Sequence, residues 1–185
     1  MIIGTKQIFA IESRIYEISE RPSLRGLGYF VVHIGGEQFG VKSPRATMLA
    51  NSFDEVCRRL SEQGSHIAPF AASLDALQLA SVVQNAVYGE LEVSGDLQEI
   101  IAIIEKRRLI WAPDGDAAFD DGTVIIQIDR APQVRLVAFR NPSDYSTGPQ
   151  DLHELWMSSD IYYETLREWS EAFLSEWTIR TQTPR

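Results

Sequence analysis

The alternation of apolar and polar residues predicts several β-strands. The segment QIFAIESRIYEI is rich in β-branched and aromatic residues and alternates in part, which is typical of a strand whose solvated face carries Glu12 and Arg14. GYFVVHI and EQFGVK flank Gly35-Gly36, and glycine tolerates the positive φ of tight hairpin turns. TVIIQID and VRLVAFR flank RAPQ in the same way. The predicted strands are residues 7–18, 28–34, 37–42, 123–129 and 134–140.

Four other segments repeat apolar residues at the spacing of an α-helix. The first opens with Ser52 and Glu55, the pattern of a capping box. The second holds a single charge, Asp75, and is therefore expected to be covered around much of its circumference, near the centre of the fold. The predicted helices are residues 52–64, 73–88, 96–108 and 158–177.

The last predicted helix has an aromatic stripe at spacings of three and four residues, which indicates one face packed on a core. The stripe consists of Tyr162, Leu166, Trp169, Phe173 and Trp177.

The order strands, helices, strands, helix favours an α+β domain. We expect an antiparallel sheet of about five or six strands with about four helices packed mainly on one face. No repeat or linker divides the sequence, so we expect a single domain over residues 1–178 and a C-terminal tail over 179–185.

Charge and cysteine content narrow the classes of function. The chain has 17 basic and 26 acidic residues and a net charge of −9, which opposes nucleic-acid binding and favours a cationic partner. Its single cysteine, Cys57, excludes an internal disulfide and lies on an apolar helix face, so we expect a buried hydrophobe. Because neither a signal peptide nor a membrane-spanning run is visible, we expect a cytoplasmic protein that does not bind membranes.

The stretch LIWAPDGDAAFDDG holds four aspartates, Asp114, Asp116, Asp120 and Asp121. It lacks the ligand alternation and terminal glutamate of a calcium loop, whereas Asp-Gly pairs are typical of turns. We favour structural turns, with an acidic patch for a partner and a metal site as the alternatives. A metal-dependent hydrolase that uses Asp114–Asp121 is the competing function.

Other catalytic or cofactor signatures are not visible in the sequence. His33, His66 and His153 lie in different segments without a familiar ligand spacing. The glycines do not form a phosphate loop or dinucleotide fingerprint, and no nucleophile elbow is present. We therefore predict no catalytic residue, no metal and no cofactor.

The remaining candidates are surfaces for binding another protein. Glu164, Glu168 and Glu171 are spaced by four and three residues, so they share one side of the last helix, as a solvated face or as a surface for a basic partner. Trp111 and Trp156 fall at the edges of predicted elements; each is either a core residue or a partly exposed interface anchor. With the four aspartates, these residues form the predicted partner-binding set.

Several blocks of the chain, in order, resemble the immunity protein 42 family of bacterial polymorphic toxin systems. These blocks are MIIGTKQIFAIE, ATMLANSFDEV, IWAPDGDAAFDDG, VRLVAF and LWMSSDIYYETLREWSEAFLSEW. The resemblance covers nearly the entire chain, and no block is a catalytic signature.

The resemblance implies a non-enzymatic inhibitor that binds a cognate toxin domain and protects the producing cell. It identifies neither the toxin's chemistry nor the interface residues, and the oligomeric state stays open. The acidic composition adds the expectation that the toxin is basic. An adaptor without a toxin partner is a third alternative.

Overall fold

The protein is described by a computed structural model, which covers residues 1–88, 95–113, 117–141 and 148–182. Its strands form two antiparallel sheets. The first has the order β1-β2-β3-β4, with β5 paired to β3, and the second has the order β6-β7-β8-β9. The strands are β1 Ile2–Thr5, β2 Phe9–Ile18, β3 Gly26–Ile34, β4 Glu37–Phe39, β5 Thr47–Met48, β6 Ile110–Ala112, β7 Thr123–Arg130, β8 Gln133–Arg140 and β9 Gln150–Ser158.

The helices follow in the expected places. They are α1 Leu49–Ser61, α2 Ala76–Tyr88, α3 Gly95–Lys106 and α4 Ser159–Gln182, with short 3-10 helices η1 Pro69–Ser73 and η2 Ala117–Phe119. The α+β class is confirmed, but the strands divide into two sheets where the sequence suggested one. Each long strand pairs with its neighbour along the chain, and within the described residues no strand of the first sheet pairs with the second.

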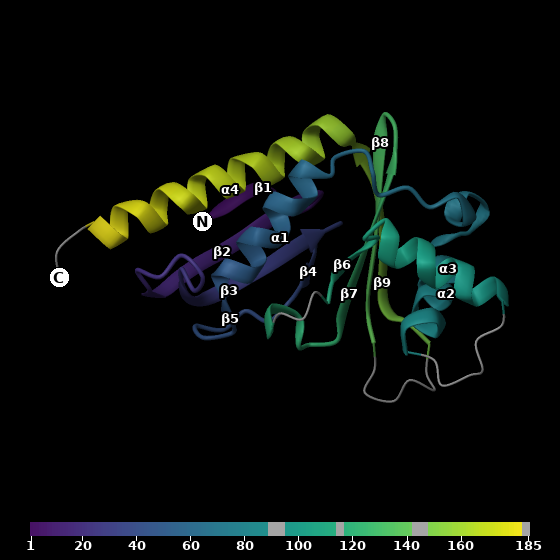
Figure 1. Ribbon diagram of the computed structural model, residues 1–185, viewed down its shortest axis with the longest axis horizontal. Coiled ribbons are helices and arrows are strands. Elements are labelled where there is room, and N and C mark those ends of the chain that lie inside the picture. Colours follow the sequence, from purple (N-terminus) through teal and green to yellow (C-terminus); the bar gives the residue numbers. More distant parts are fainter. Residues whose placement is uncertain (89–94, 114–116, 142–147, 183–185) are drawn as a thin grey trace.

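The two sheets build two apolar cores. In Figure 1, α1 and α4 cover one face of the first sheet, and the second sheet lies between this unit and the pair α2 and α3. Alternate residues of β7 face opposite cores: Ile125 packs with α1 and α4, whereas Val124 and Ile126 pack with α2 and α3. The second sheet is therefore covered on both faces.

Helix α4 joins the layers through its aromatic stripe. Tyr162, Leu166, Trp169 and Phe173 are fully buried, which confirms the predicted core face. The indole N–H of Trp169 donates to the Ser13 hydroxyl at 3.0 Å, and its ring stacks on Phe173. The helix continues to Gln182, into the segment predicted to be a tail.

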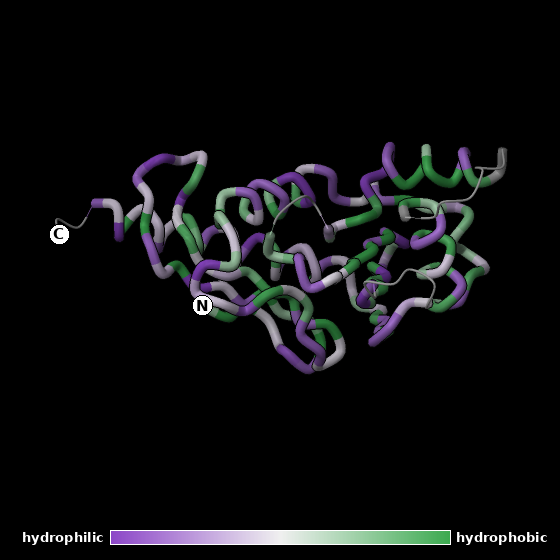
Figure 2. Tube along the Cα trace, turned by 90° about the horizontal axis from the view of Figure 1, so that it is seen from below, coloured by the Kyte–Doolittle hydropathy of each residue, from purple (hydrophilic) through white to green (hydrophobic). Residues whose placement is uncertain are grey.

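Some local expectations were wrong. Helix α1 begins at Leu49 with Met48 as its N-cap, so Ser52 lies within the helix and does not form a capping box. Helix α2 lies at the periphery with Leu77 and Val87 exposed, because the second sheet and α3 cover only part of its surface. Figure 2 shows hydrophobic and hydrophilic positions alternating along the helices at the end of the molecule where α2 and α3 lie.

Strands β1, β5, β6 and β9 were not expected from the sequence. β1 and β6 are too short to show a clear alternation. β9 lies between a segment of loop composition, residues 141–151, and the predicted start of the last helix at residue 158, so no strand was predicted there. Cys57 is half-buried against the core, and burial raises the pKa of its thiol, as expected for a structural cysteine.

Glu12 lies on the face of the first sheet opposite α1 and α4, and it is buried rather than solvated. Its carboxylate accepts hydrogen bonds from Lys6 Nζ at 2.6 Å and Tyr29 Oη at 3.0 Å. It also lies 2.6 Å from Lys42 Nζ and 3.0 Å from His33 Nε2. Burial alone raises the pKa of Glu12, but these four partners outweigh burial and lower it from 4.5 to about 2.

Replacing Glu12 by Gln tests this cluster. Because the folded pKa is depressed, the stabilisation is present above pH 4.5 and is lost as the pH falls toward 2. We expect Glu12→Gln to lower the free energy of unfolding by about 3 kcal/mol at pH 7, with more than half of the difference gone at pH 3. Urea denaturation at both pH values measures this, with the exposed Glu37→Gln as control. An equal loss at pH 7 and pH 3 would contradict it.

Candidate partner-binding surface

The outer side of α4 carries a row of carboxylates. Glu164, Glu168 and Glu171 are all exposed, and their spacing places them opposite the buried aromatic stripe. Asp160, in the first turn, is exposed beside them. We call these four residues the acidic face. It extends over roughly 16 Å along a helix that lies on the outside of the molecule.

The glutamates of the acidic face differ in their pairing. Glu164 forms an ion pair with Arg167, one turn further along the helix. Within the described residues, neither Glu168 nor Glu171 has a cation within ion-pairing distance. Ile161 and Ile179, both about 60% exposed, lie at the two ends of the same side of α4. An exposed acidic strip of this kind is complementary in charge to a basic protein surface.

Trp111 does not belong to this surface. Its side chain is 1% exposed and packs against Phe9 and Tyr162, and the Arg59 guanidinium lies 5.4 Å from its ring centroid. Of the two readings of Trp111, core burial is therefore the correct one. The short strand β6 pairs with β7, and this pairing places the indole between the sheets.

Trp156 on β9 is partly exposed and held in a fixed position. Its side chain is 37% exposed, and its indole N–H donates to Glu154 Oε1 at 3.1 Å. The guanidinium groups of Arg130 and Arg135 lie 5.7 and 5.3 Å from its ring centroid. A tryptophan oriented in this way is a suitable interface anchor.

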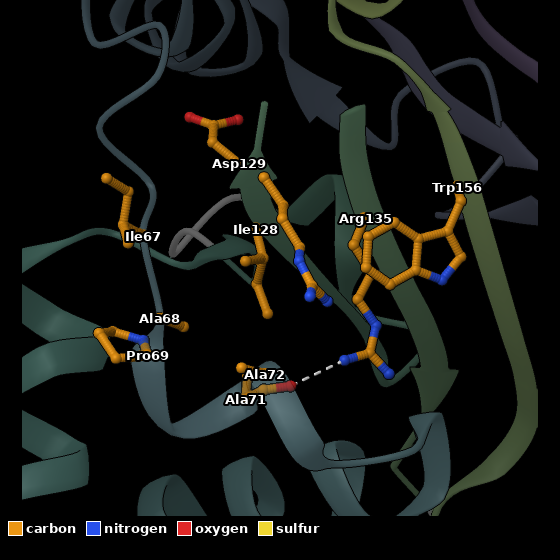
Figure 3. A pocket seen from close by; sticks show the side chains of 10 residues that line it. Ile67, Ala68, Pro69, Ala71, Ala72, Ile128, Asp129, Arg135 and Trp156 are labelled. Carbon is orange, nitrogen blue, oxygen red and sulfur yellow. Dashed lines mark hydrogen bonds between the residues drawn. The ribbon is translucent and has the colours of Figure 1, made fainter. Parts of the chain in front are cut away.

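A pocket of about 160 Å³ lies beside Trp156 (Figure 3). Its wall opposite the indole comes from η1 and the segment before it, and includes Ile67 and Ala72. Arg135 holds this wall in place, because its guanidinium donates to Ala71 O at 3.1 Å and to Leu74 O at 3.0 Å. The same guanidinium donates to Glu154 at 2.8 Å.

The aspartate-rich stretch is only partly described. Asp114 and Asp116 lie outside the described residues. Asp121 accepts hydrogen bonds from the backbone N–H of Thr123 and of Gly40, each at 3.2 Å, so this carboxylate ties the turn before β7 to the end of β4. Asp120 is exposed. Over the part of the chain that the structure covers, no three acidic, histidine or cysteine side chains are grouped to hold a metal ion.

The histidines lie in three different surroundings. His33 contacts Glu12. His66 is buried with Nδ1 2.9 Å from Arg107 O, and burial, followed by the charge of Arg59, lowers its pKa. The ring of His153 packs edge-on against Phe39.

Sequence reasoning missed Ile67, Asp129 and Arg130. They lie near one another because the segment after α1 runs past the β7–β8 hairpin: Asp129 N donates to His66 O at 2.8 Å. The only sequence signal was RAPQ, which marked the hairpin turn but not its neighbour.

Among the described helices, none combines the length and apolar composition needed to cross a bilayer.

An exposed acidic helix and an oriented tryptophan are compatible with binding to another protein. Comparison with known families agrees, since the profile described as Immunity protein 42 matches residues 1–172. The chain therefore belongs to the immunity protein 42 family, as the sequence resemblance implied. Its function is that of an immunity protein, which neutralises a toxin.

A solved structure shares the fold. The crystal structure of CdiI from Burkholderia dolosa AUO158 superposes with a TM-score of 0.57 at 12% sequence identity. The match covers 91% of this chain and 97% of that chain. At this identity the likeness shows a common fold. No curated protein sequence matches the chain.

The adjacent residues Asp120 and Asp121 give a matched test, because one is exposed and the other accepts hydrogen bonds that stabilise a turn. Asp121→Ala leaves the backbone N–H of Thr123 without this acceptor, whereas the N–H of Gly40 keeps Thr123 Oγ1 at 3.1 Å, so we expect a loss of about 1–3 kcal/mol in the free energy of unfolding. Asp120→Ala is expected to change stability by less than about 0.5 kcal/mol. Thermal and urea unfolding measure both. Equal effects of the two substitutions would show that Asp121 has no special structural role.

Proposed function

We propose that this immunity protein neutralises its toxin by binding a basic surface of the toxin through the acidic face of α4, without chemistry of its own. The observation that carries the proposal is the exposure of Glu168 and Glu171 on the side of α4 that turns away from the core. Since α4 is held along its length by buried aromatic residues, these carboxylates are presented on a rigid element.

Charge supports the same proposal at longer range. A net charge of −9 attracts a cationic partner before contact and speeds the encounter. Trp156 provides an anchor of the kind that slows dissociation once water is excluded. We also propose that the protein acts in the cytoplasm of the producing cell, where a free toxin molecule would otherwise act repeatedly.

Family membership supports a non-enzymatic role. No observation favours the metal-dependent hydrolase: the Asp121 carboxylate is engaged by backbone N–H groups, and the described residues lack a metal-holding group.

Co-expression tests the proposal directly. The toxin domain encoded immediately upstream should arrest growth when produced alone. Growth should recover when this chain is produced with it, and the two proteins should co-purify. Arrest without recovery, together with failure to co-purify, would overturn the proposed function.

Charge reversal on α4 tests the surface. We expect Glu168→Lys with Glu171→Lys to reduce the association rate with the toxin about tenfold at low salt and to weaken its dependence on ionic strength. The matched control is Glu99→Lys with Glu105→Lys, which makes the same charge change at exposed positions of α3. Surface plasmon resonance at several salt concentrations measures both pairs. Equal slowing by the two pairs would assign the effect to net charge and remove the acidic face from the interface.

A further inference from the structure

A second pocket lies where the end of α1, the β7–β8 hairpin and the start of α4 meet. It has a volume of about 340 Å³, at the lower end of the range for binding sites in proteins. We call it the Asp129 pocket. Its lining includes Gln63, Ile67, Asp129, Gln133, Ser159 and Tyr163.

The pocket shares Ile67 and Asp129 with the pocket beside Trp156, so the two adjoin. In Figure 3 the carboxylate of Asp129 points away from Trp156 and Arg135. The two pockets therefore differ in charge: arginines lie around the tryptophan, and a carboxylate lies in the Asp129 pocket.

The carboxylate of Asp129 is held in one orientation by three donors. Tyr163 Oη lies 2.8 and 2.9 Å from its two oxygens, Gln127 Nε2 donates to Oδ1 at 3.1 Å, and the backbone N–H of His66 donates to Oδ2 at 3.1 Å. Burial and then the negative charge of Asp129 raise the pKa of Tyr163, so its hydroxyl remains a donor. A carboxylate has roughly four acceptor positions, and these three donors occupy three of them, so one position of Asp129 stays open.

The charge of Asp129 is not neutralised by an ion pair within the described residues. Its donors are an amide, a hydroxyl and a backbone N–H, and all of them are uncharged. A partner cation would therefore meet a preoriented carboxylate that needs no side-chain rearrangement. An anion would be repelled, and a metal ion would find a single carboxylate already engaged by three donors.

The other walls suit a guanidinium group in particular. Gln63 and Gln133 are exposed and offer side-chain carbonyl oxygens, and Ile67, 45% exposed, supplies an apolar surface. The ring of Tyr163 is 2% exposed, so this residue contributes its hydroxyl, which holds Asp129. Arginine has a planar fork of five donors that can serve a carboxylate and neighbouring carbonyl oxygens together, whereas lysine has a compact charge with three donors.

The pocket is continuous with the acidic face. Ser159, the first residue of α4, lines the pocket, and Asp160 and Glu164 are exposed in the first two turns of the same helix. A basic protein bound along α4 reaches the pocket from the helix start.

We propose that the Asp129 pocket receives one arginine side chain of the toxin. The proposal rests on the proposed function, in which a basic toxin binds the acidic face. The arginine donates to Asp129, and its apolar stem packs against Ile67. The pocket fixes the register of a complex whose encounter is driven by the general charge of α4.

The test places a cation from this protein itself in the pocket, by substitution of a residue that lines it. Gln133 is exposed and its backbone pairs remain available after substitution, so Gln133→Arg places a guanidinium beside Asp129 without removing any of the donors to Asp129. The matched control is Gln98→Arg, the same change at an exposed position of α3. Both variants add one positive charge, so the difference between their dissociation rates from the toxin isolates the contribution of the pocket.

Binding to the toxin domain encoded immediately upstream is measured by surface plasmon resonance. We expect Gln133→Arg to increase the dissociation rate at least tenfold and Gln98→Arg to change it less than twofold. Replacing the toxin's arginines one at a time by alanine should identify one whose loss is not additive with Gln133→Arg. If Gln133→Arg does not fold, Gln63→Arg makes the same test from another wall.

The outcomes separate the two proposals. A wild-type chain that fails to bind the toxin overturns the proposed function, and the pocket assignment falls with it. Tight binding by wild type with equal dissociation of Gln133→Arg and Gln98→Arg overturns the pocket assignment alone. The pocket assignment is also overturned if no toxin arginine shows an effect on binding that is non-additive with Gln133→Arg.

Discussion

The buried side-chain amide of Gln127 connects the two halves of the molecule. Its oxygen accepts hydrogen bonds from Tyr162 Oη at 2.6 Å and Arg59 Nη1 at 2.9 Å, and its nitrogen donates to Asp129 and Tyr163. One fully buried residue of β7 thus binds α1 and α4 at once. A buried polar group that loses a partner costs about 1–3 kcal/mol, so the sheets and helices are held in one relative arrangement. Arg59, which is 1% exposed, adds to this constraint because its charge requires Glu55, 3.0 Å away, to stay in place.

This constraint also orients the binding surface. The network fixes Tyr163 on the inner side of α4 and Asp129 at the hairpin, and the outer side of the same helix carries the glutamates. The proposed interface therefore combines two physical effects. Exposed carboxylates act at a distance and determine the rate of encounter, while an oriented group in a pocket acts at contact and determines the rate of escape. A protein that must inactivate a toxin benefits from both, because a nanomolar complex requires about 12 kcal/mol of binding free energy.

The fold itself tolerates wide sequence change. CdiI from Burkholderia dolosa shares the architecture at 12% identity, so most side chains can differ while the layers persist. What must persist is burial of the faces between the layers. The proposed interface places specificity at exposed positions of α4 and the hairpin, which the core does not constrain.

The sequence by itself determined the local structure with short-range periodicity. The spacing of Tyr162, Trp169 and Phe173 predicted the buried face of α4, the same spacing placed Glu168 and Glu171 on the opposite side, and Gly35-Gly36 marked a hairpin turn in which both residues have positive φ. Only the tertiary structure decided that the strands form two sheets, that Trp111 lies between them and that Asp129 faces the segment after α1. The physical reason is that a side-chain period depends on neighbours a few residues away. Pairings such as that of His66 with Asp129 join segments far apart in the chain, and their geometry arises only when the layers pack.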